Sequence, residues 1–217
     1  MDTSRTVSIK AGHVKLEGLL SIPKAATGLV VFVHGSGSSR LSVRNQYAAK
    51  LMNQAGLATL LFDLLTPQEN QVDEITREYR FNIELLSQRT ISTIDWISEH
   101  TQLQKLSIGL FGASTGAAAA LYAAKARPNE VECVVSRGGR PDLAMPALPE
   151  VLAPTLLIVG GLDIEVLQLN QQALQAMEIM KTECDLLVVD GATHLFEESD
   201  TLQTAAEAAK QWFLRHL

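Results

Sequence analysis

Hydrophobic residues follow two different patterns along this chain of 217 residues. From Thr6 to Ile22 apolar and polar positions alternate around Ala11-Gly12, which is typical of an antiparallel hairpin at a sheet edge. Further on, the apolar residues form short unbroken runs, which indicate strands buried on both faces in a parallel sheet. These runs are Gly28–Val33, Leu57–Phe62, Leu106–Phe111, Val131–Val135, Thr155–Val159 and Leu186–Val189.

Amphipathic stretches of helical period separate these runs. They are Val43–Ala55, Ile75–Ser98, Thr115–Ala126, Val166–Met180 and Leu202–Leu214. The alternation of strands and helices predicts an α/β fold, a three-layer α/β/α sandwich with a mostly parallel central sheet and the antiparallel N-terminal hairpin. Because no repeat, low-complexity linker or composition break occurs, we expect one domain over residues 1–217.

Composition narrows the classes of partner. The net charge is −6 and the basic residues are scattered among acids, so neither nucleic acid nor a membrane surface is an expected partner. The N-terminus lacks an apolar leader core, and no apolar stretch reaches the roughly 20 residues that span a bilayer. Cys133 and Cys184 lie in apolar runs and are expected to be packed free thiols. We predict a cytoplasmic protein, either a monomer or a homodimer.

Glycine-rich polar segments follow the apolar runs, at the sheet edge where parallel sheets bind their ligands. The most informative is Gly112-Ala113-Ser114-Thr115-Gly116, a G-x-S-x-G motif between a buried run and an Ala-rich helix. Its glycines allow backbone to pass close to a sharply turned serine, and the helix N-terminus favours negative charge. The motif predicts Ser114 as a nucleophile. The alternative is an ordinary strand-to-helix turn with a capping serine.

A serine hydroxyl needs a base that accepts its proton. The chain has five histidines. His13, His100 and His216 are expected at the surface, and His34 is expected to shape the turn before Gly35. His194 alone follows the last predicted strand in a loop, so we predict it as the base.

The base in turn needs a carboxylate that orients it. Asp163 follows the penultimate predicted strand after Gly160-Gly161-Leu162, which places its loop beside that of His194. The chain order Ser, Asp, His is the order that G-x-S-x-G hydrolases use. Glu165 and Asp190 remain rivals, and Asp163 could instead cap the following helix.

Acyl transfer also needs N–H donors for the tetrahedral oxyanion. The backbone N–H of Thr115 is one candidate. The glycine-rich loop after the first long apolar run offers the other, from Ser36 or from Gly37. The alternative is that this loop is a plain tight turn.

In this arrangement the chain resembles the α/β-hydrolase superfamily over essentially its whole length. Its compact size and the segments HGSGSSR and GATHLF are similar to the dienelactone hydrolase family. The resemblance implies the α/β-hydrolase fold and hydrolase activity. The namesake enzymes carry a cysteine nucleophile, whereas this chain has Ser114, so ordinary ester hydrolysis is expected rather than dienelactone opening. Where many superfamily members insert a lid, only Ser136 to Ala153 are available, which implies no cap domain and an open site.

Two arginines bear on the substrate. Arg137 and Arg140 follow a predicted strand at its carboxyl end, where a guanidinium could bind a carboxylate or phosphate near the scissile bond. The alternative is that both pair with local acids such as Asp142 or Glu150.

These observations predict a serine hydrolase that cleaves a small carboxylic ester or lactone through an acyl-enzyme, with no metal or organic cofactor. One alternative is a non-catalytic small-molecule-binding protein of the same fold. Another is an acyltransferase or thioesterase, which would differ in the acceptor of the acyl group. A purely structural role leaves the glycines around Ser114 unexplained.

Overall fold

The computed structural model describes residues 4–179 and 181–217, and within them the strands form one eight-stranded sheet of order β1-β2-β4-β3-β5-β6-β7-β8. The strands are β1 (Arg5–Ala11), β2 (Val14–Ser21), β3 (Gly28–Val33), β4 (Ala58–Phe62), β5 (Ser107–Ala113), β6 (Val131–Arg137), β7 (Thr155–Gly160) and β8 (Cys184–Val189). The hairpin β1–β2 and the pair β2–β4 are antiparallel, and the remaining pairs are parallel. The predicted fold class, including the N-terminal hairpin at the sheet edge, is confirmed.

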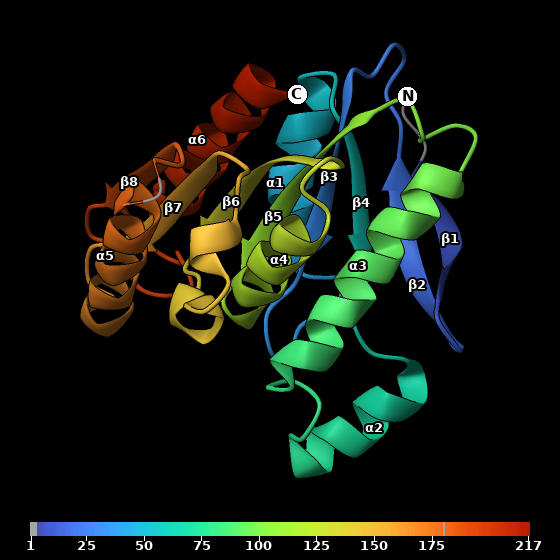
Figure 1. Cartoon of the computed structure of the whole chain (residues 1–217), viewed down its shortest axis with the longest axis horizontal. Helices are drawn as coiled ribbons and strands as arrows, with labels where there is room; N and C mark the ends of the chain where they lie inside the picture. The colour runs from blue at the N-terminus through green and yellow to red at the C-terminus, as the bar shows by residue number, and fades with distance from the viewer. Residues whose placement is uncertain (1–3, 180) are drawn as a thin grey trace.

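Helices cover both faces of the sheet (Figure 1), with α3, α4 and α5 on one face and α1 and α6 on the other. Their bounds are α1 (Val43–Gln54), α3 (Ile83–Glu99), α4 (Thr115–Ala126), α5 (Ile164–Ile179) and α6 (Thr201–His216). Successive residues of β3 face opposite sides, so Val31 packs under α3 and α4 while Phe32 packs under α1 and α6. The Phe32 ring stacks on Phe111 with a centroid distance of 4.9 Å. The sheet is therefore buried from both sides, as its unbroken apolar runs require.

One predicted element is wrong. The hydrophobic pattern predicts a single helix over Ile75–Ser98, whereas the structure has two helices, α2 (Pro67–Thr76) and α3. Arg77 ends α2 in the left-handed conformation, with φ 59°. Asn82 then begins α3 by accepting the N–H of Leu85 on its side chain. The end of the predicted helix at Met180 lies outside the described residues.

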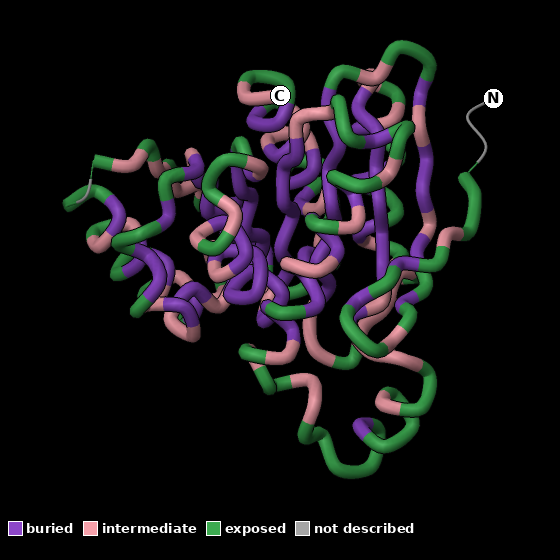
Figure 2. Tube along the Cα trace, turned by 45° about the vertical axis from the view of Figure 1, so that its right-hand side comes forward, coloured by how far each residue is buried: buried purple, intermediate pink, exposed green. Residues whose placement is uncertain are grey.

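Polar contacts rather than apolar burial hold α2 in place. Thr66 and Glu69 form a capping box at its start, and Glu69 also pairs with Arg89 of α3 at 2.8 Å. Near its end, buried Asp73 pairs with Arg80 at 2.6 Å. The helix projects beyond the end of the sheet (Figure 1), and this projecting segment is mostly exposed in Figure 2.

Between β6 and β7 the chain forms only two short 3-10 helices, Pro141–Ala144 and Leu148–Glu150. No cap domain follows β6, because this segment packs against α4 and α5 instead of extending over the sheet end.

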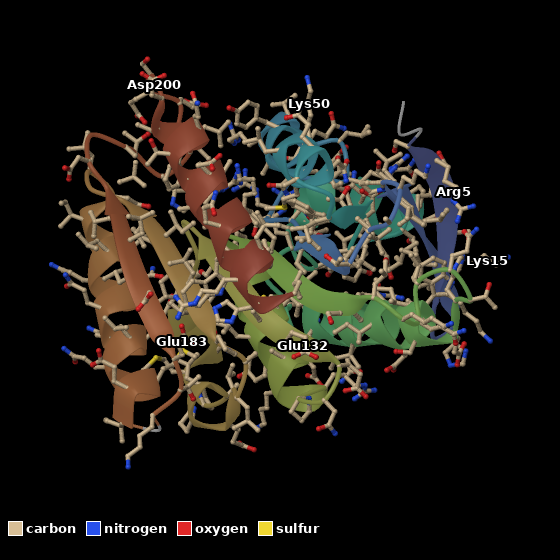
Figure 3. All side chains as sticks on the ribbon, turned by 90° about the horizontal axis from the view of Figure 1, so that it is seen from above. Arg5, Lys15, Lys50, Glu132, Glu183 and Asp200 are labelled. Carbon is tan, nitrogen blue, oxygen red and sulfur yellow. The ribbon has the colours of Figure 1, made fainter. Side chains whose placement is uncertain are left out.

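Charged side chains surround the molecule (Figure 3). Arg5 and Lys15 lie at the hairpin end of the sheet, and Glu183 and Asp200 lie towards the opposite end. Within residues 4–179 and 181–217, none of the helices has the length and apolar character that a membrane crossing requires.

Candidate active site

Ser114 occupies a strained turn between β5 and α4. Its φ of 50° and ψ of −123° are uncommon for a residue with a side chain. Its neighbours hold it there from both sides. The Ser114 N–H donates to the carbonyl of Arg137 at 3.3 Å, and its own carbonyl accepts the N–H of Arg140 at 3.1 Å. The end of β6 therefore fixes the turn that presents this hydroxyl.

The two glycines of the motif are explained by close packing. A Cβ on Gly116 would lie 2.2 Å from the carbonyl oxygen of Val33, and one on Gly112 would lie 2.4 Å from Cα of Ala117. Any side chain at either position would push the turn away from β3 or from α4. Both glycines thus allow Ser114 to sit directly beside the loop that follows β3.

His194 and Asp163 are in contact. Nδ1 of His194 lies 2.6 Å from Oδ2 of Asp163, and the carboxylate is the more buried of the two side chains. The rivals Glu165 and Asp190 make no hydrogen bond to His194 in the part of the chain that the structure describes. A carboxylate at this position fixes Nδ1 as the protonated nitrogen and leaves Nε2 as an acceptor.

The loops that carry this pair are tightly packed. A Cβ on Gly160 would lie 2.3 Å from the carbonyl oxygen of Ala192, so glycine allows the loops after β7 and β8 to touch. Glu198 accepts two further bonds from Thr193, from its N–H at 3.0 Å and from its hydroxyl at 2.5 Å. These contacts set the position of His194.

Ser114 and His194 line one pocket of about 220 Å³, together with Gly35, Ser36 and Arg137. Among the described residues, no hydrogen bond joins the Ser114 hydroxyl to the imidazole. Such bonds are often long in ligand-free enzymes and tighten when substrate binds. The structure therefore brings the predicted nucleophile and base to one pocket without joining them.

The two candidate oxyanion donors are neighbours. The hydroxyl groups of Ser36 and Thr115 are 2.8 Å apart, and Ser36 also donates its proton to the carbonyl of Arg80 at 3.1 Å. Since Ser36 has only one hydroxyl proton, Thr115 is the donor in the bond between them. Within the described chain neither backbone N–H of this pair has an acceptor. Both N–H groups are thus available to an oxyanion.

His34 shapes the loop, as its place before Gly35 suggests. Its Nδ1 lies 2.9 Å from the carbonyl of Gly35, and its Nε2 accepts the N–H of Leu64 at 3.0 Å. Burial lowers the pKa of the imidazole, so it is neutral and can accept at Nε2 while donating at Nδ1. His34 thereby ties the loop after β3 to the loop after β4. The contact with Leu64 could not be predicted from the sequence, because it depends on β3 lying beside β4 in the sheet.

The two arginines differ in their surroundings. Arg140 forms a two-pronged ion pair with Asp142, with both N–O distances 2.8 Å, which is the local pairing that the sequence left open as the alternative. It does not line the pocket of Ser114 in the described structure. Arg137 lines that pocket, is buried, and donates from Nη2 to Oδ1 of Asn45 at 3.1 Å.

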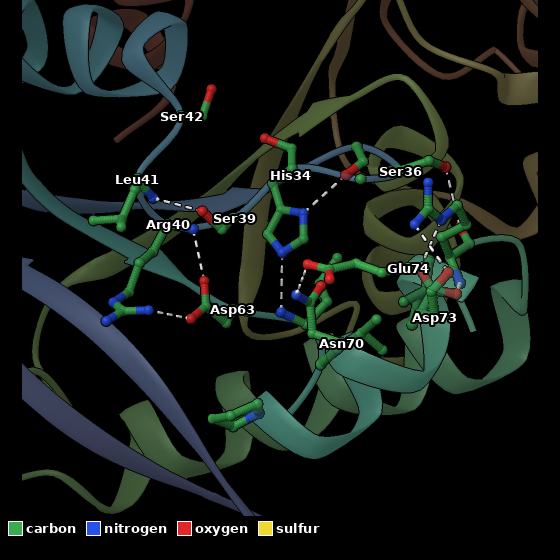
Figure 4. Close-up of a pocket in the computed structure, with 18 residues that line it drawn as sticks. His34, Ser36, Ser39, Arg40, Leu41, Ser42, Asp63, Asn70, Asp73 and Glu74 are labelled. Carbon is green, nitrogen blue, oxygen red and sulfur yellow. Dashed lines mark hydrogen bonds and ion pairs between the residues drawn. The ribbon is translucent and has the colours of Figure 1, made fainter. Parts of the chain in front are cut away.

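A second, larger cavity of about 570 Å³ adjoins the pocket (Figure 4). Gly35, Ser36, Ser38 and Ser42 line both. Residues of the segment after β4 line only the larger one, including Asn70, Asp73, Glu74 and Arg80. Hydrophobic periodicity did not predict that this segment lines a cavity, although the capping-box sequence Thr66-Pro67-Gln68-Glu69 is a signal that could have located the start of α2.

In the described part of the chain, no group of three or more His, Cys, Asp or Glu side chains is arranged to hold a metal ion. The two cysteines are free, Cys133 fully buried and Cys184 partly buried. Burial raises the pKa of each thiol to about 12.

Comparison with known proteins decides the family, because the family model of the dienelactone hydrolases matches residues 16–217. The chain belongs to the dienelactone hydrolase family. A crystal structure of a dienelactone hydrolase from Anabaena variabilis is 51% identical, has a TM-score of 0.97 and aligns over 100% of this chain and 99% of its own. The resemblance to this family is confirmed, and family membership supports a hydrolase.

Two further comparisons show a shared fold at low identity and a match to part of longer relatives. The esterase Est1E from Butyrivibrio proteoclasticus shares the fold, with a TM-score of 0.81 at 15% identity over 97% of this chain and 98% of its own. Curated relatives from two Mycobacterium tuberculosis strains, CDC 1551 and H37Rv, are 52% identical over 97% of this chain and are provisionally named phosphoribosyl transferases. The chain spans about half of their length, 46%.

Proposed function

We propose that this protein is a serine hydrolase that cleaves a small carboxylic ester or lactone with Ser114, His194 and Asp163. The observation that carries the proposal is the 2.6 Å contact of His194 Nδ1 with Asp163, next to a strained serine that lines the same pocket as the imidazole. Family membership supports the hydrolase class. The ester specificity and the acyl-enzyme mechanism are our inference.

In the proposed mechanism, Ser114 Oγ attacks the substrate carbonyl while His194 Nε2 takes its proton. Asp163 stabilises the imidazolium that forms. The oxyanion accepts the backbone N–H groups of Ser36 and Thr115, which have no other acceptor in the described structure. The imidazolium then protonates the leaving alcohol, and the same base activates a water molecule that releases the acid and restores the serine.

The two adjoining pockets suit a small ester with two unequal arms. A carbonyl held at Ser36 lies at the boundary between the 220 Å³ pocket and the 570 Å³ cavity, since this residue lines both. One arm can enter each space. Polar and charged side chains line the larger cavity, so it suits a polar group better than a long acyl chain.

Labelling with a neutral fluorophosphonate probe tests the proposal directly. The probe should modify the wild-type protein, which should also hydrolyse p-nitrophenyl acetate. Both reactions should be lost in Ser114→Ala. Ser87→Ala is the matched control and should keep both reactions. The Ser87 hydroxyl donates to the carbonyl of Ile83 within α3 at 2.6 Å. A wild-type protein that folds but neither labels nor turns over would refute the hydrolase and favour the non-catalytic binding protein.

The acceptor of the acyl group separates a hydrolase from an acyltransferase, whereas a thioesterase also uses water and differs in cleaving a thioester. Water as the acceptor gives a product rate independent of added alcohol or thiol, whereas an acyltransferase shows acyl transfer to the added acceptor. A panel of matched esters and thioesters in the presence of glycerol distinguishes these cases.

The phosphoribosyl transferase name belongs to relatives about twice as long, and we assign only the hydrolase reaction to this chain. A cytoplasmic location and a monomeric or homodimeric state remain predictions.

A further inference from the structure

Arg137 is a buried cation with too few partners. Arg137 is only 8% exposed, and the single hydrogen bond of its guanidinium within the described chain runs from Nη2 to Asn45 Oδ1 at 3.1 Å. Nη1 is buried without any partner. In residues 4–179 and 181–217, no carboxylate lies within ion-pair distance of this guanidinium. Five N–H donors and one positive charge are thus matched by one amide oxygen.

This charge persists at neutral pH. Burial and, to a smaller extent, the nearby charge of Arg44 lower the pKa of Arg137 to about 10, and that value still leaves the guanidinium protonated at pH 7. The ring of Phe111, 5.4 Å from the guanidinium carbon, offers a weak cation–π contact. A buried charge without an anionic partner is costly, so an anion bound beside this guanidinium would offset its desolvation.

The groups around the guanidinium are suited to an anion. Arg137 lines the pocket of Ser114 and His194, and Arg44 and Ser42 line it as well. Ser42 caps the N-terminus of α1, where the helix dipole also favours negative charge. Arg44 is half-buried, and its one ion pair within the described residues is a 3.4 Å contact with exposed Glu197. No carboxylate lines this pocket among the described residues.

We propose that Arg137 binds an oxyanion, a carboxylate or a phosphate monoester, carried by the substrate beside its scissile ester bond. The inference rests on the proposed function for the ester bond, but the anion site itself is a property of this pocket. Arg140 does not share the role, because Asp142 already neutralises it. The chain is then expected to favour anionic esters over neutral esters of the same size.

Three aryl acetates with the same acyl group test this preference in the wild-type protein. They are 4-acetoxybenzoate, 4-acetoxyphenyl phosphate and the neutral methyl 4-acetoxybenzoate. The proposal expects kcat/KM for at least one anionic ester to exceed that of the neutral ester by about 10- to 100-fold, the range that a charge-assisted hydrogen bond supplies. The better of the two anions identifies the source, carboxylate or phosphate. A ratio near one for both would overturn the proposal.

Variants locate the effect. In Arg137→Met the preference for the anionic ester should fall to near one, and Arg137→Lys should retain part of it because the charge remains while the planar fork is lost. Arg127→Met is the matched control, since Arg127 pairs with Asp95 at the end of α4 and should keep the wild-type preference. Equal loss of preference in the Arg127 and Arg137 variants would contradict the assignment.

A binding measurement separates this inference from the hydrolase proposal. In Ser114→Ala, which cannot turn over, benzoate or inorganic phosphate should raise the melting temperature and should compete with each other. The same anions should have no such effect in Ser114→Ala/Arg137→Met. Anion binding without fluorophosphonate labelling of wild type would refute the hydrolase and keep the anion site. Fluorophosphonate labelling of wild type without anion binding or anion preference would keep the hydrolase and refute the anion site.

Discussion

Nδ1 of His194 lies 2.6 Å from Oδ2 of Asp163, although the two residues are 31 positions apart in the chain. They come from the loops after β8 and β7, two parallel neighbours whose carboxyl ends lie side by side. The side chain of His194 is 38% exposed and that of Asp163 is 15% exposed. The carboxylate is therefore the more buried partner, while the imidazole that it holds lines the pocket of Ser114.

Asp163→Asn is expected to lower kcat by a factor on the order of 10⁴, because an amide can stabilise the wrong imidazole tautomer and cannot stabilise the imidazolium. Steady-state hydrolysis of p-nitrophenyl acetate measures the effect. Asp190→Asn is the matched control, since Asp190 is exposed and makes no hydrogen bond to His194 in the described structure. Equal activity of Asp163→Asn and wild type, both folded by circular dichroism, would remove Asp163 from the mechanism.

Thr115→Val should reduce kcat by about 2- to 10-fold, the equivalent of one neutral hydrogen bond. The substitution keeps the shape of the side chain but removes the 2.8 Å hydrogen bond to Ser36. The loop that carries the proposed oxyanion donor Ser36 is then no longer held beside the turn that carries Ser114. Thr115→Ser retains the hydroxyl and should behave as wild type. A drop of similar size in Thr115→Ser would point to packing of buried Thr115 instead.

Alkylation by iodoacetamide should leave the activity unchanged. Cys133 is fully buried, and burial raises the pKa of Cys133 and Cys184 to about 12, so neither thiol supplies thiolate near neutral pH. Ser114→Cys, which introduces the nucleophile of the family's namesake enzymes, supplies the positive control and should become sensitive to the reagent. Loss of wild-type activity in parallel with alkylation of Cys133 would indicate that this strand opens more readily than its packing implies.

Much of this structure could be predicted from local pattern. The unbroken apolar runs located the parallel strands because burial on both faces leaves no polar position within them. The tight turn at Ser114 is indicated by two glycines that sterics require, and the contact of Asp163 with His194 is indicated by their places after neighbouring strands. These features are set by residues close in sequence or by the regular order of a parallel sheet.

The remaining features depend on distant partners. α2 was missed because its apolar side chains Val72 and Ile75 stay exposed, 42% and 86%, so hydrophobic periodicity carries no information about its position. The contact of His34 with Leu64 depends on β3 lying beside β4. The lack of an anionic partner for Arg137 depends on which side chains the whole fold brings to its pocket, and no local pattern encodes that.

The pairing of Asp73 with Arg80 makes the position of α2 sensitive to acid. Burial alone would raise the pKa of Asp73, but the backbone and side-chain hydrogen bonds from Arg80, together with the N–H of Tyr79, outweigh it and hold the pKa below its usual value. A carboxyl group with a lowered pKa stabilises the folded state above its unfolded pKa of about 4, and that stabilisation is lost as the pH falls through the folded value.

Asp73→Asn should therefore destabilise the protein at pH 7, by about 1–3 kcal/mol, because the donors of Arg80 lose a charged acceptor. The difference between variant and wild type should shrink as the pH falls below about 4, since protonated Asp73 resembles the amide. Urea unfolding at pH 7 and at low pH measures both values, and hydrogen exchange shows whether the loss is confined to residues 67–82. Glu74→Gln, one position along the same helix and exposed, is the matched control and should show neither effect. If the destabilisation of Asp73→Asn grew on acidification, charge pairing could not be what holds α2 beside the larger cavity.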